Sequence, residues 1–393
     1  MRIALHVAAL AILATGCATP PSHMMPAPVL FKDASFDLTK AMVPALKETT
    51  VPVFFATERA PSGDESHYAN AEGGGVRLGM ATIGLGAPDW DWPRLVASDA
   101  TSDTTQLRLS RIDAVREFGR AGDAAAQQAL IDRIDAQLAR TLNEDLVFYV
   151  HGYRVDFEEV TTLMGSFAHY LGHGGAMVAF SWPTGKQFWN YLTDCPRAER
   201  YVPDIADTIA LLANALVALR KRHPGETDAA IAARYRLGNV IFAASDVDLK
   251  TFASEHVPAI LGIARQMIVY VSENDGALKW SSMLSGASRL GRPKVEELTR
   301  EELERLATSP NFQAIDVSSV RGAHEMGGGM KGHGYWYAND WISTDILLSM
   351  RYQLAPAQRG LERGTGRNVW TIPPDYPQRL REAVLRNRPD LAK

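Results

Sequence analysis

The sequence has little cysteine, no marked excess of charge of either sign and no internal repeat. Its two cysteines are Cys17 and Cys195, so no network of disulfides can stabilise the fold. The 41 basic and 45 acidic residues nearly cancel and form no long single-sign run, which argues against a nucleic-acid-binding surface. With 393 residues, 46% of them hydrophobic, the chain is long enough to bury an ordinary core.

The start of the chain has the pattern of an export signal. Arg2 precedes an apolar stretch over residues 3–14, which is too short to span a bilayer, and small residues lead to Cys17. This stretch resembles a bacterial lipoprotein signal with residues 14–17 as its lipobox. The resemblance implies that Cys17 carries the lipid, and Ala18 implies transfer to the outer membrane, facing the periplasm. The alternative is plain secretion with cleavage nearby.

The chain therefore divides into three parts: a signal with its lipidation site at 1–17, a linker at 18–50 and a single domain at 51–393. The linker is rich in Pro and Met with weak periodicity, which is typical of a tether that holds a domain off a membrane. Once Cys17 is acylated, Cys195 is the remaining thiol. Its surroundings, TDCPRAER, carry no catalytic signature, so we interpret it as a structural cysteine.

Strand-like apolar runs alternate with amphipathic helical segments from residue 51 onward. A Gly-rich polar loop is expected at 73–75, and the run at 312–320 is expected to be the last strand. The alternation predicts an α/β fold with a mostly parallel sheet and helices on both faces. The expected strands are 51–59, 77–86, 146–153, 177–183, 239–246, 266–275 and 312–320, and the expected helices are 121–140, 164–175, 201–223, 249–265, 296–307 and 342–352.

The run LVFYVHGY, residues 146–153, is the clearest candidate for a strand buried on both faces, in the middle of the sheet. Ligands of such sheets bind beyond the carboxyl ends of the strands. His151, Gly152 and Tyr153 therefore lie where chemistry is expected. The alternative is that the His-Gly pair only makes a turn.

Several motifs, in this order, resemble a family of bacterial α/β-hydrolases known mainly as a domain of unknown function, esterase-like or lipase-like and often lipoproteins. The resemblance covers about residues 25–353. The motifs are VPVFFATER, RLGMATIGLG, FYVHGY, FSWPTG, AASDVDLKTF, YVSENDGAL and GHGYW.

The resemblance implies roles for particular residues. Asp275 matches the family's catalytic acid and His333 its base, while residues 151–153 match the loop that supplies an oxyanion-hole N–H. In this fold the partners follow in the order nucleophile, acid, base, and the base takes the proton of a serine hydroxyl. The implied substrate is a small ester or acyl compound, and no cofactor is expected. His324 is a rival for the base, in a Gly-rich stretch.

The family's nucleophile is missing. No G-x-S-x-G occurs in the sequence, and residues 225–238 contain no apolar strand run, although a strand, an elbow and a helix need about 30 residues. We therefore expect one βα unit to be deleted, and with it the central nucleophile strand. The strand at 239–246 is expected to close the gap by pairing with 146–153. An open gap instead costs about 1 to 3 kcal/mol for each buried backbone group left unpaired.

Closing the gap suggests Ser245 as a substitute nucleophile. It lies at the carboxyl end of the 239–246 strand, but Val247 is larger than the small residue that an elbow requires. The alternative is a turn or capping serine. Asp246 and Asp248 lack further ligands at metal-binding spacing, so we expect helix capping at Leu249 and no metal.

Two interpretations of function remain open. The first is a lipid-anchored α/β-hydrolase whose inherited activity is serine ester hydrolysis. The second is an inactive relative, a scaffold or ligand-binding lipoprotein of the cell envelope, because loss of a nucleophile typically costs several orders of magnitude in rate. The membrane is the expected partner, through the N-terminal lipid.

Overall fold

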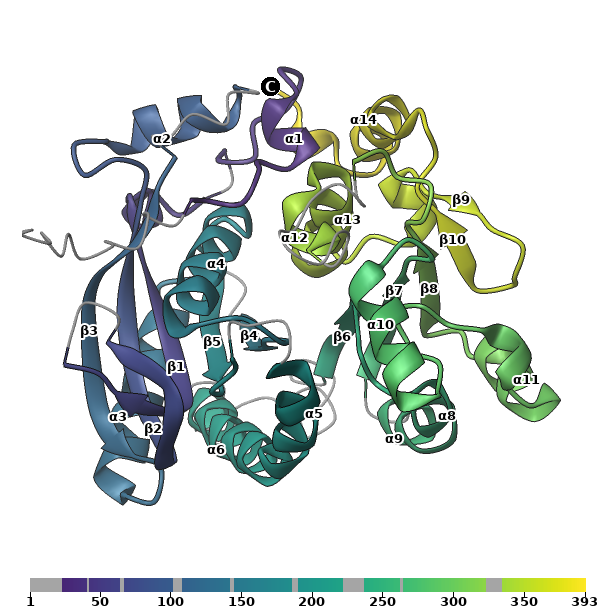
Figure 1. The fold of residues 1–393 in the computed structure, drawn as a ribbon. Coiled ribbons are helices and arrows are strands. Elements are labelled where there is room, and N and C mark those ends of the chain that lie inside the picture. The colour runs from purple at the N-terminus through teal and green to yellow at the C-terminus, as the bar shows by residue number, and fades with distance from the viewer. Residues whose placement is uncertain are drawn as a thin grey trace, which may run out of the picture.

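The computed structural model (Figure 1) describes two five-stranded sheets with helices packed around them. The described residues are 23–40, 42–63, 67–101, 108–141, 145–185, 190–221, 237–261, 264–322 and 334–393.

The first sheet has the strand order β3-β2-β1-β5-β4. Strands β1 to β3 form an antiparallel meander, whereas β1, β5 and β4 run parallel. The bounds are β1 Thr50–Pro61, β2 Tyr68–Leu85, β3 Ser110–Arg120, β4 Asp145–Val150 and β5 Gly175–Ser181.

The second sheet has the order β6-β7-β8-β10-β9 and is parallel except for its last pair. The bounds are β6 Leu237–Ala243, β7 Ala264–Val271, β8 Phe312–Asp316, β9 Glu362–Arg363 and β10 Val369–Thr371. With five parallel and three antiparallel ladders in the described residues, the strands are mostly parallel, as predicted.

The helices pack around these sheets, and several begin at the capping residues that their sequences supply. Asp156 and Glu159 form a capping box at the start of α4, and Asp123 caps α3. The α-helices are α1 Val29–Lys32, α2 Trp92–Asp99, α3 Ala124–Leu138, α4 Phe157–Tyr170, α5 Tyr191–Arg200, α6 Val202–Lys221, α8 Leu249–Thr251, α9 Val257–Leu261, α10 Gly276–Ser285, α11 Arg300–Thr308, α12 Tyr335–Ala338, α13 Asp340–Arg351 and α14 Tyr376–Asn387. Short 3-10 turns span Pro44–Leu46, Val295–Glu297, Pro356–Arg359 and Pro389–Leu391, and a π turn spans Phe252–His256.

Helices cover both faces of the first sheet, as the strand pattern predicts. In β5, Met177 and Ala179 belong to the core beneath α4, whereas Val178 and Phe180 belong to the core beneath α3 and α6. Successive residues of a strand point to opposite faces, so a continuous apolar run is what a strand covered on both sides requires. All of β5 is accordingly buried.

Several sequence expectations differ from the structure. The helix expected at 164–175 begins earlier, as α4 over Phe157–Tyr170. Residues 73–75 lie inside β2 rather than in a loop, and the extra residues there are absorbed by shifts in the β1–β2 register. The expected helix at 249–265 is divided into α8, the π turn and α9. Strand β3 was not predicted because its sequence, SRIDAVREFGR, carries many charges. The run at 312–320 is not the last strand, since β9 and β10 follow.

The segment before β1 is packed into the core. Met24, Met25, Ala27, Leu30 and Phe36 are all nearly inaccessible and belong to the largest core cluster. The Pro and Met content that suggested a tether thus supplies apolar side chains to the domain from residue 23 onward. No helix in the described part of the chain is both long and apolar enough to cross a membrane.

Strand β4, the predicted centre of the sheet, is an edge strand among the described residues. It pairs with β5 alone, and β6 pairs with β7 alone, so the expected pairing of 239–246 with 146–153 is wrong for this part of the chain. Most residues of both strands are half-exposed, and the exposed fraction of Val150 is 37%. Residues 222–236, which precede β6, lie outside the described residues.

Candidate functional site

The parallel strands of both sheets end in loops that carry the predicted site residues. In the first sheet, β4 ends before His151 and β5 ends before Trp182. In the second sheet, β6 ends before Ala244 and β7 ends shortly before Asp275. Ligands of open α/β sheets bind at such carboxyl ends, so the residues in these loops are the candidates for a site.

The imidazole of His151 is buried and held in one tautomer. Its Nε2 accepts a hydrogen bond from the Trp182 backbone N–H (3.1 Å), so the proton lies on Nδ1, which donates to the Gly152 carbonyl (2.7 Å). The Trp182 indole stacks on the ring at an interplanar angle of 2° and donates to the His151 carbonyl (2.9 Å). Burial, and then the Arg59 charge, lower the pKa of His151 to about 3. This neutral side chain fixes the loop to β5.

Arg59 is another buried polar group at this end, and sequence reasoning missed it. Its guanidinium donates to Ser181 Oγ (2.7 Å) and to the Val155 carbonyl (2.6 Å), and its Nη2 lies 3.4 Å from His151 Nε2. Burial lowers the pKa of Arg59 to about 10. An arginine inside a strand-like run, ATER, gives no signal of this role, because the acceptors come from distant parts of the chain.

The rest of the predicted oxyanion loop is more open. Gly152 is exposed, and a Cβ built on it meets no atom of the described structure within 4 Å. Tyr153 is half-buried, and Arg154 has a left-handed backbone with φ of 63°. Thr184 Oγ1 donates to the Val155 carbonyl (2.7 Å) and so holds the end of the loop beside β5.

Asp275 is fully buried at the start of α10. Its carboxylate accepts a hydrogen bond from the Leu278 N–H (3.0 Å), which makes it the N-cap of that helix. Tyr335 lies close by: burial, and then the Asp275 charge, raise the pKa of its phenol. The Tyr335 hydroxyl accepts from the Ala244 N–H and donates to the Tyr270 carbonyl (3.0 Å each), so it joins the ends of β6 and β7. The GHGYW motif contains Tyr335 and was a signal for it.

Ser245 lies in a tight turn after β6. The preceding residue, Ala244, has a left-handed backbone with φ of 50°. Ser245 Oγ accepts a long hydrogen bond from the Val247 N–H (3.4 Å), and its carbonyl accepts from Gly291 (2.8 Å). A Cβ on Gly291 would lie 2.8 Å from Ser245 N, so only glycine permits this approach.

The two aspartates after Ser245 have structural partners. Asp248 caps α8 by accepting from the Thr251 N–H (2.9 Å), which confirms the capping expectation for it. Asp246 forms an ion pair with Arg289 (3.3 Å) and accepts from the Ser281 hydroxyl. Within the described ranges, no three His, Cys, Asp or Glu side chains gather as a metal site.

Helix α12 connects the two sheets at this end. Next to Tyr335, the Trp336 ring lies 5.5 Å from the Tyr149 ring of β4 and 5.6 Å from the Phe167 ring of α4. The predicted base His333 and its rival His324 lie outside the described residues, as does Cys17. The structure therefore gives the positions of Asp275, Ser245 and the 151–153 loop. Their distances to the predicted base, His333, lie outside what it describes.

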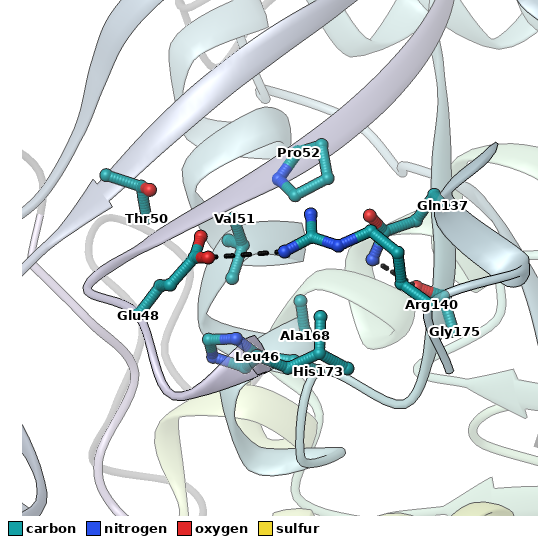
Figure 2. A pocket seen from close by; sticks show the side chains of 10 residues that line it. All are labelled: Leu46, Glu48, Thr50, Val51, Pro52, Gln137, Arg140, Ala168, His173 and Gly175. Carbon is teal, nitrogen blue, oxygen red and sulfur yellow. Dashed lines mark hydrogen bonds and ion pairs between the residues drawn. The ribbon is translucent and has the colours of Figure 1, made fainter. Parts of the chain in front are cut away.

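The small cavity in Figure 2 lies at the opposite, amino edge of the first sheet. Glu48 pairs with Arg140 (3.2 Å) there, and Gln137 donates to the Gly175 carbonyl. Its volume of about 10 Å³ holds at most about one water molecule. It is too small for an organic substrate. Its lining residues are Leu46, Glu48, Thr50, Val51, Pro52, Gln137, Arg140, Ala168, His173 and Gly175.

A comparison with known protein families shows to which family the chain is related. A family described as "Alpha/beta hydrolase of unknown function (DUF900)" matches residues 124–351, more than half of the chain. The chain belongs to this family. The matched region of this α/β-hydrolase runs from α3 to the end of α13, so it contains β4, β6, Asp275 and Tyr335. No curated protein and no solved structure matches the chain.

Proposed function

We propose that this α/β-hydrolase is a lipid-anchored protein of the cell envelope that keeps the fold of an ester hydrolase without its turnover, and acts as a scaffold or binds a small ligand. The observation that carries the proposal is the missing serine elbow. The sequence has no G-x-S-x-G, and the serine after β6 has its hydroxyl bonded to the backbone of its own turn.

Loss of the nucleophile removes the step on which the other groups depend. The acid and base act on a serine hydroxyl, the base by taking its proton and the acid by orienting the base. Without that hydroxyl, an oxyanion-binding loop can still hold a carbonyl compound but forms no acyl intermediate. Enzymes deprived of the nucleophile lose roughly 10⁶-fold in rate.

Ester hydrolysis through Ser245 is the second candidate, and one observation favours it. Ser245 follows a left-handed residue, Ala244, at a strand-to-helix turn, and a strained strand-to-helix turn carries the nucleophile in this fold. In this mechanism His333 removes the Ser245 proton, Asp275 orients His333, and the N–H groups of the 151–153 loop bind the developing oxyanion.

A fluorophosphonate probe together with p-nitrophenyl esters of several acyl lengths separates the two candidates. The proposal expects no labelling and no turnover above the buffer rate. The second candidate expects labelling that Ser245→Ala abolishes, while Ser285→Ala, a change at an exposed serine of α10, leaves it unchanged. Labelling that survives Ser245→Ala contradicts both candidates.

The anchor is tested separately by mass spectrometry of the mature N-terminus and by membrane fractionation. A diacylglyceryl adduct on Cys17, lost in Cys17→Ser, supports the lipoprotein proposal, with the outer membrane as the expected fraction. An unmodified N-terminus in the soluble envelope fraction contradicts it.

A further inference from the structure

The Arg59 guanidinium lies beside the loop that follows β4 and is held from three directions. Its Nε donates to Ser181 Oγ at the end of β5 (2.7 Å), its Nη1 donates to Asn70 Oδ1 in β2, and its Nη2 donates to the Val155 carbonyl (2.6 Å). The side chain is fully buried, so it cannot touch a ligand on the outer side of the loop. Any effect that Arg59 has on a ligand passes through its neighbours.

Two hydrogen-bond donors face the same nitrogen of His151. The Trp182 backbone N–H lies 3.1 Å from Nε2, and Arg59 Nη2 lies 3.4 Å from it. Since a guanidinium has donors only, Nε2 is the nitrogen without a proton, and Nδ1 carries the proton that is donated to the Gly152 carbonyl (2.7 Å). Arg59 thus faces the lone pair of the ring.

The Arg59 charge also keeps a second proton off the ring. Burial, and then this charge, lower the pKa of His151 to about 3, and the charge of Asp156 at the start of α4 opposes the shift. A second proton on Nε2 would meet the Trp182 N–H, so the ring would have to turn and Nδ1 would leave the Gly152 carbonyl. The loop therefore keeps its hydrogen bonds only while His151 is neutral.

The Nδ1 bond sets the direction of the peptide after Gly152. Its carbonyl is turned toward the buried ring. This peptide is trans, and in a trans peptide the N–H lies opposite the carbonyl, so the N–H of Tyr153 is directed away from the ring. Gly152 is exposed, and a Cβ built on it meets no described atom within 4 Å. The outer side of the loop therefore has room for a ligand.

The charge of Arg59 suits the same kind of ligand as this peptide. The three oxygens that it binds are neutral. Burial lowers its pKa, and the carboxylates of Asp156 and Glu159, which form the capping box of α4, offset this in part. A buried guanidinium bound to neutral acceptors favours an electron-rich oxygen nearby.

We propose that Arg59 is a positioning residue of the ligand-binding loop: it holds the Val155 end of the loop and keeps His151 neutral, so that the peptide after Gly152 directs its N–H toward a ligand oxygen. The ligand class is an acyl compound, whose carbonyl or carboxylate oxygen accepts this hydrogen bond. The ligand part of the inference rests on the proposed function, whereas the effect of Arg59 on His151 is tested without a ligand.

Nitrogen-15 NMR of the histidine rings and amide hydrogen exchange of the full-length chain test the effect on the loop. In the wild-type protein we expect a proton on Nδ1 and none on Nε2 of His151 from pH 7 down to about pH 4.5. In Arg59→Met we expect the second proton to bind at higher pH, and the amides of residues 152–155 to exchange about tenfold faster, because a hydrogen bond to a charged donor is lost. If either property matches the wild-type protein, the inference is wrong.

Two further variants separate the role of Arg59 from its contribution to stability. Arg59→Lys keeps the charge without the planar fork, and is expected to restore the titration of His151 but only part of the exchange protection. Arg351→Met is the matched control, because Arg351 is also a buried arginine whose guanidinium donates to carbonyls, those of Tyr170 (3.1 Å) and Leu38 (2.9 Å). It is expected to leave the titration of His151 unchanged, and an equal change there overturns the inference. A proton on Nε2 of wild-type His151 overturns it even if no variant folds.

Butyrate is the ligand probe, because it carries an acyl oxygen and is not hydrolysed under either candidate function. We expect butyrate to shift the amide resonance of Tyr153 in the wild-type protein, and to bind at least about tenfold more weakly to Arg59→Met. Equal binding to the two proteins overturns the role of Arg59 in ligand binding. A wild-type protein that does not respond contradicts the ligand binding of the proposed function, and the ring and exchange measurements still decide the effect of Arg59 on the loop.

Discussion

At the scale of single residues, buried histidines give this protein a definite response to pH. His173 has a left-handed backbone, with φ of 53°, after the end of α4. Burial, and then the neighbouring His169, lower its pKa to about 3, while a backbone hydrogen bond at Leu46 opposes the shift and the charges of Arg351 and Arg140 add to it. The folded protein therefore holds this imidazole neutral in mildly acidic solution.

The sign of the effect follows from the two pKa values. The unfolded chain, with a histidine pKa of about 6.5, binds a proton that folded His173 does not bind until about pH 3. The free energy of unfolding therefore falls as the pH drops from about 6.5 toward 3. We expect His173→Asn, which tolerates the left-handed backbone, to lessen this slope by up to about 1.4 kcal/mol per pH unit.

Urea denaturation between pH 4 and pH 8 measures the slope. The matched control is His67→Asn, which also replaces a histidine with a left-handed backbone (φ of 59°) but at a half-exposed position. A pH slope that His173→Asn leaves unchanged would show that the imidazole is already protonated in the folded state. His151, buried beside Arg59 with a pKa of about 3, contributes in the same direction in all three proteins.

At the scale of elements, β4 and β6 have sequences of central strands but positions at sheet edges. The apolar runs DLVFYV and LGNVIFA suit strands covered on both sides. Among the described residues each pairs on one side only. Tyr335 and Trp336 of α12 connect the two edges where the site is expected, through Ala244 and Tyr149 respectively.

Hydrogen exchange tests this edge arrangement. Amides of β5, which is paired with β1 and β4 and buried throughout, are expected to exchange slowest in the first sheet, and those of β7 slowest in the second. Amides of β4 and β6 that point away from their single neighbours are expected to exchange faster, because they open to solvent without disrupting a ladder. Uniform protection across β4, β5, β6 and β7 would mean that another strand pairs with the two edges.

At the scale of the whole molecule, the segment before β1 pairs with the last residues of the chain. Phe36 bridges to Ala392, and the N–H of Lys393 donates to the Ser35 carbonyl (3.0 Å). The C-terminal elements are themselves fixed by a buried ion pair between Arg359 and Asp345 (2.6 Å). One core cluster includes side chains from both sheets and from the segment before β1.

Truncation tests the contribution of the N-terminal segment. A chain that starts at His23 keeps every described buried side chain and is expected to unfold at the same temperature as the full-length chain. A chain that starts at Val51 loses Met24, Leu30, Phe36 and other core residues, each of which contributes roughly 1.5 to 3 kcal/mol when buried. We expect it to aggregate or melt far lower. Equal melting temperatures would show that the segment is dispensable.

The sequence by itself determined the fold class, most of the central strands and helices, and the family. Apolar period, capping residues and ordered motifs are local, so β1, β5, β7 and α3 could be predicted from them, whereas only the second half of α4 was. Asp275 also fell at a strand end, where its motif placed it. The expected mechanism depends on His333, which stays a prediction.

Only the tertiary structure decided which strands are edges, how far the N-terminal segment is packed, and what holds the site. Strand pairing depends on partners that are distant in sequence. The apolar sequence of β4 does not show whether one neighbouring strand or two pair with it. Charged β3 and the short strands near the C-terminus carry weak local signals but gain their stability from the sheets that they join. The roles of Arg59 and Tyr335 likewise arise from acceptors and donors that only the fold brings near.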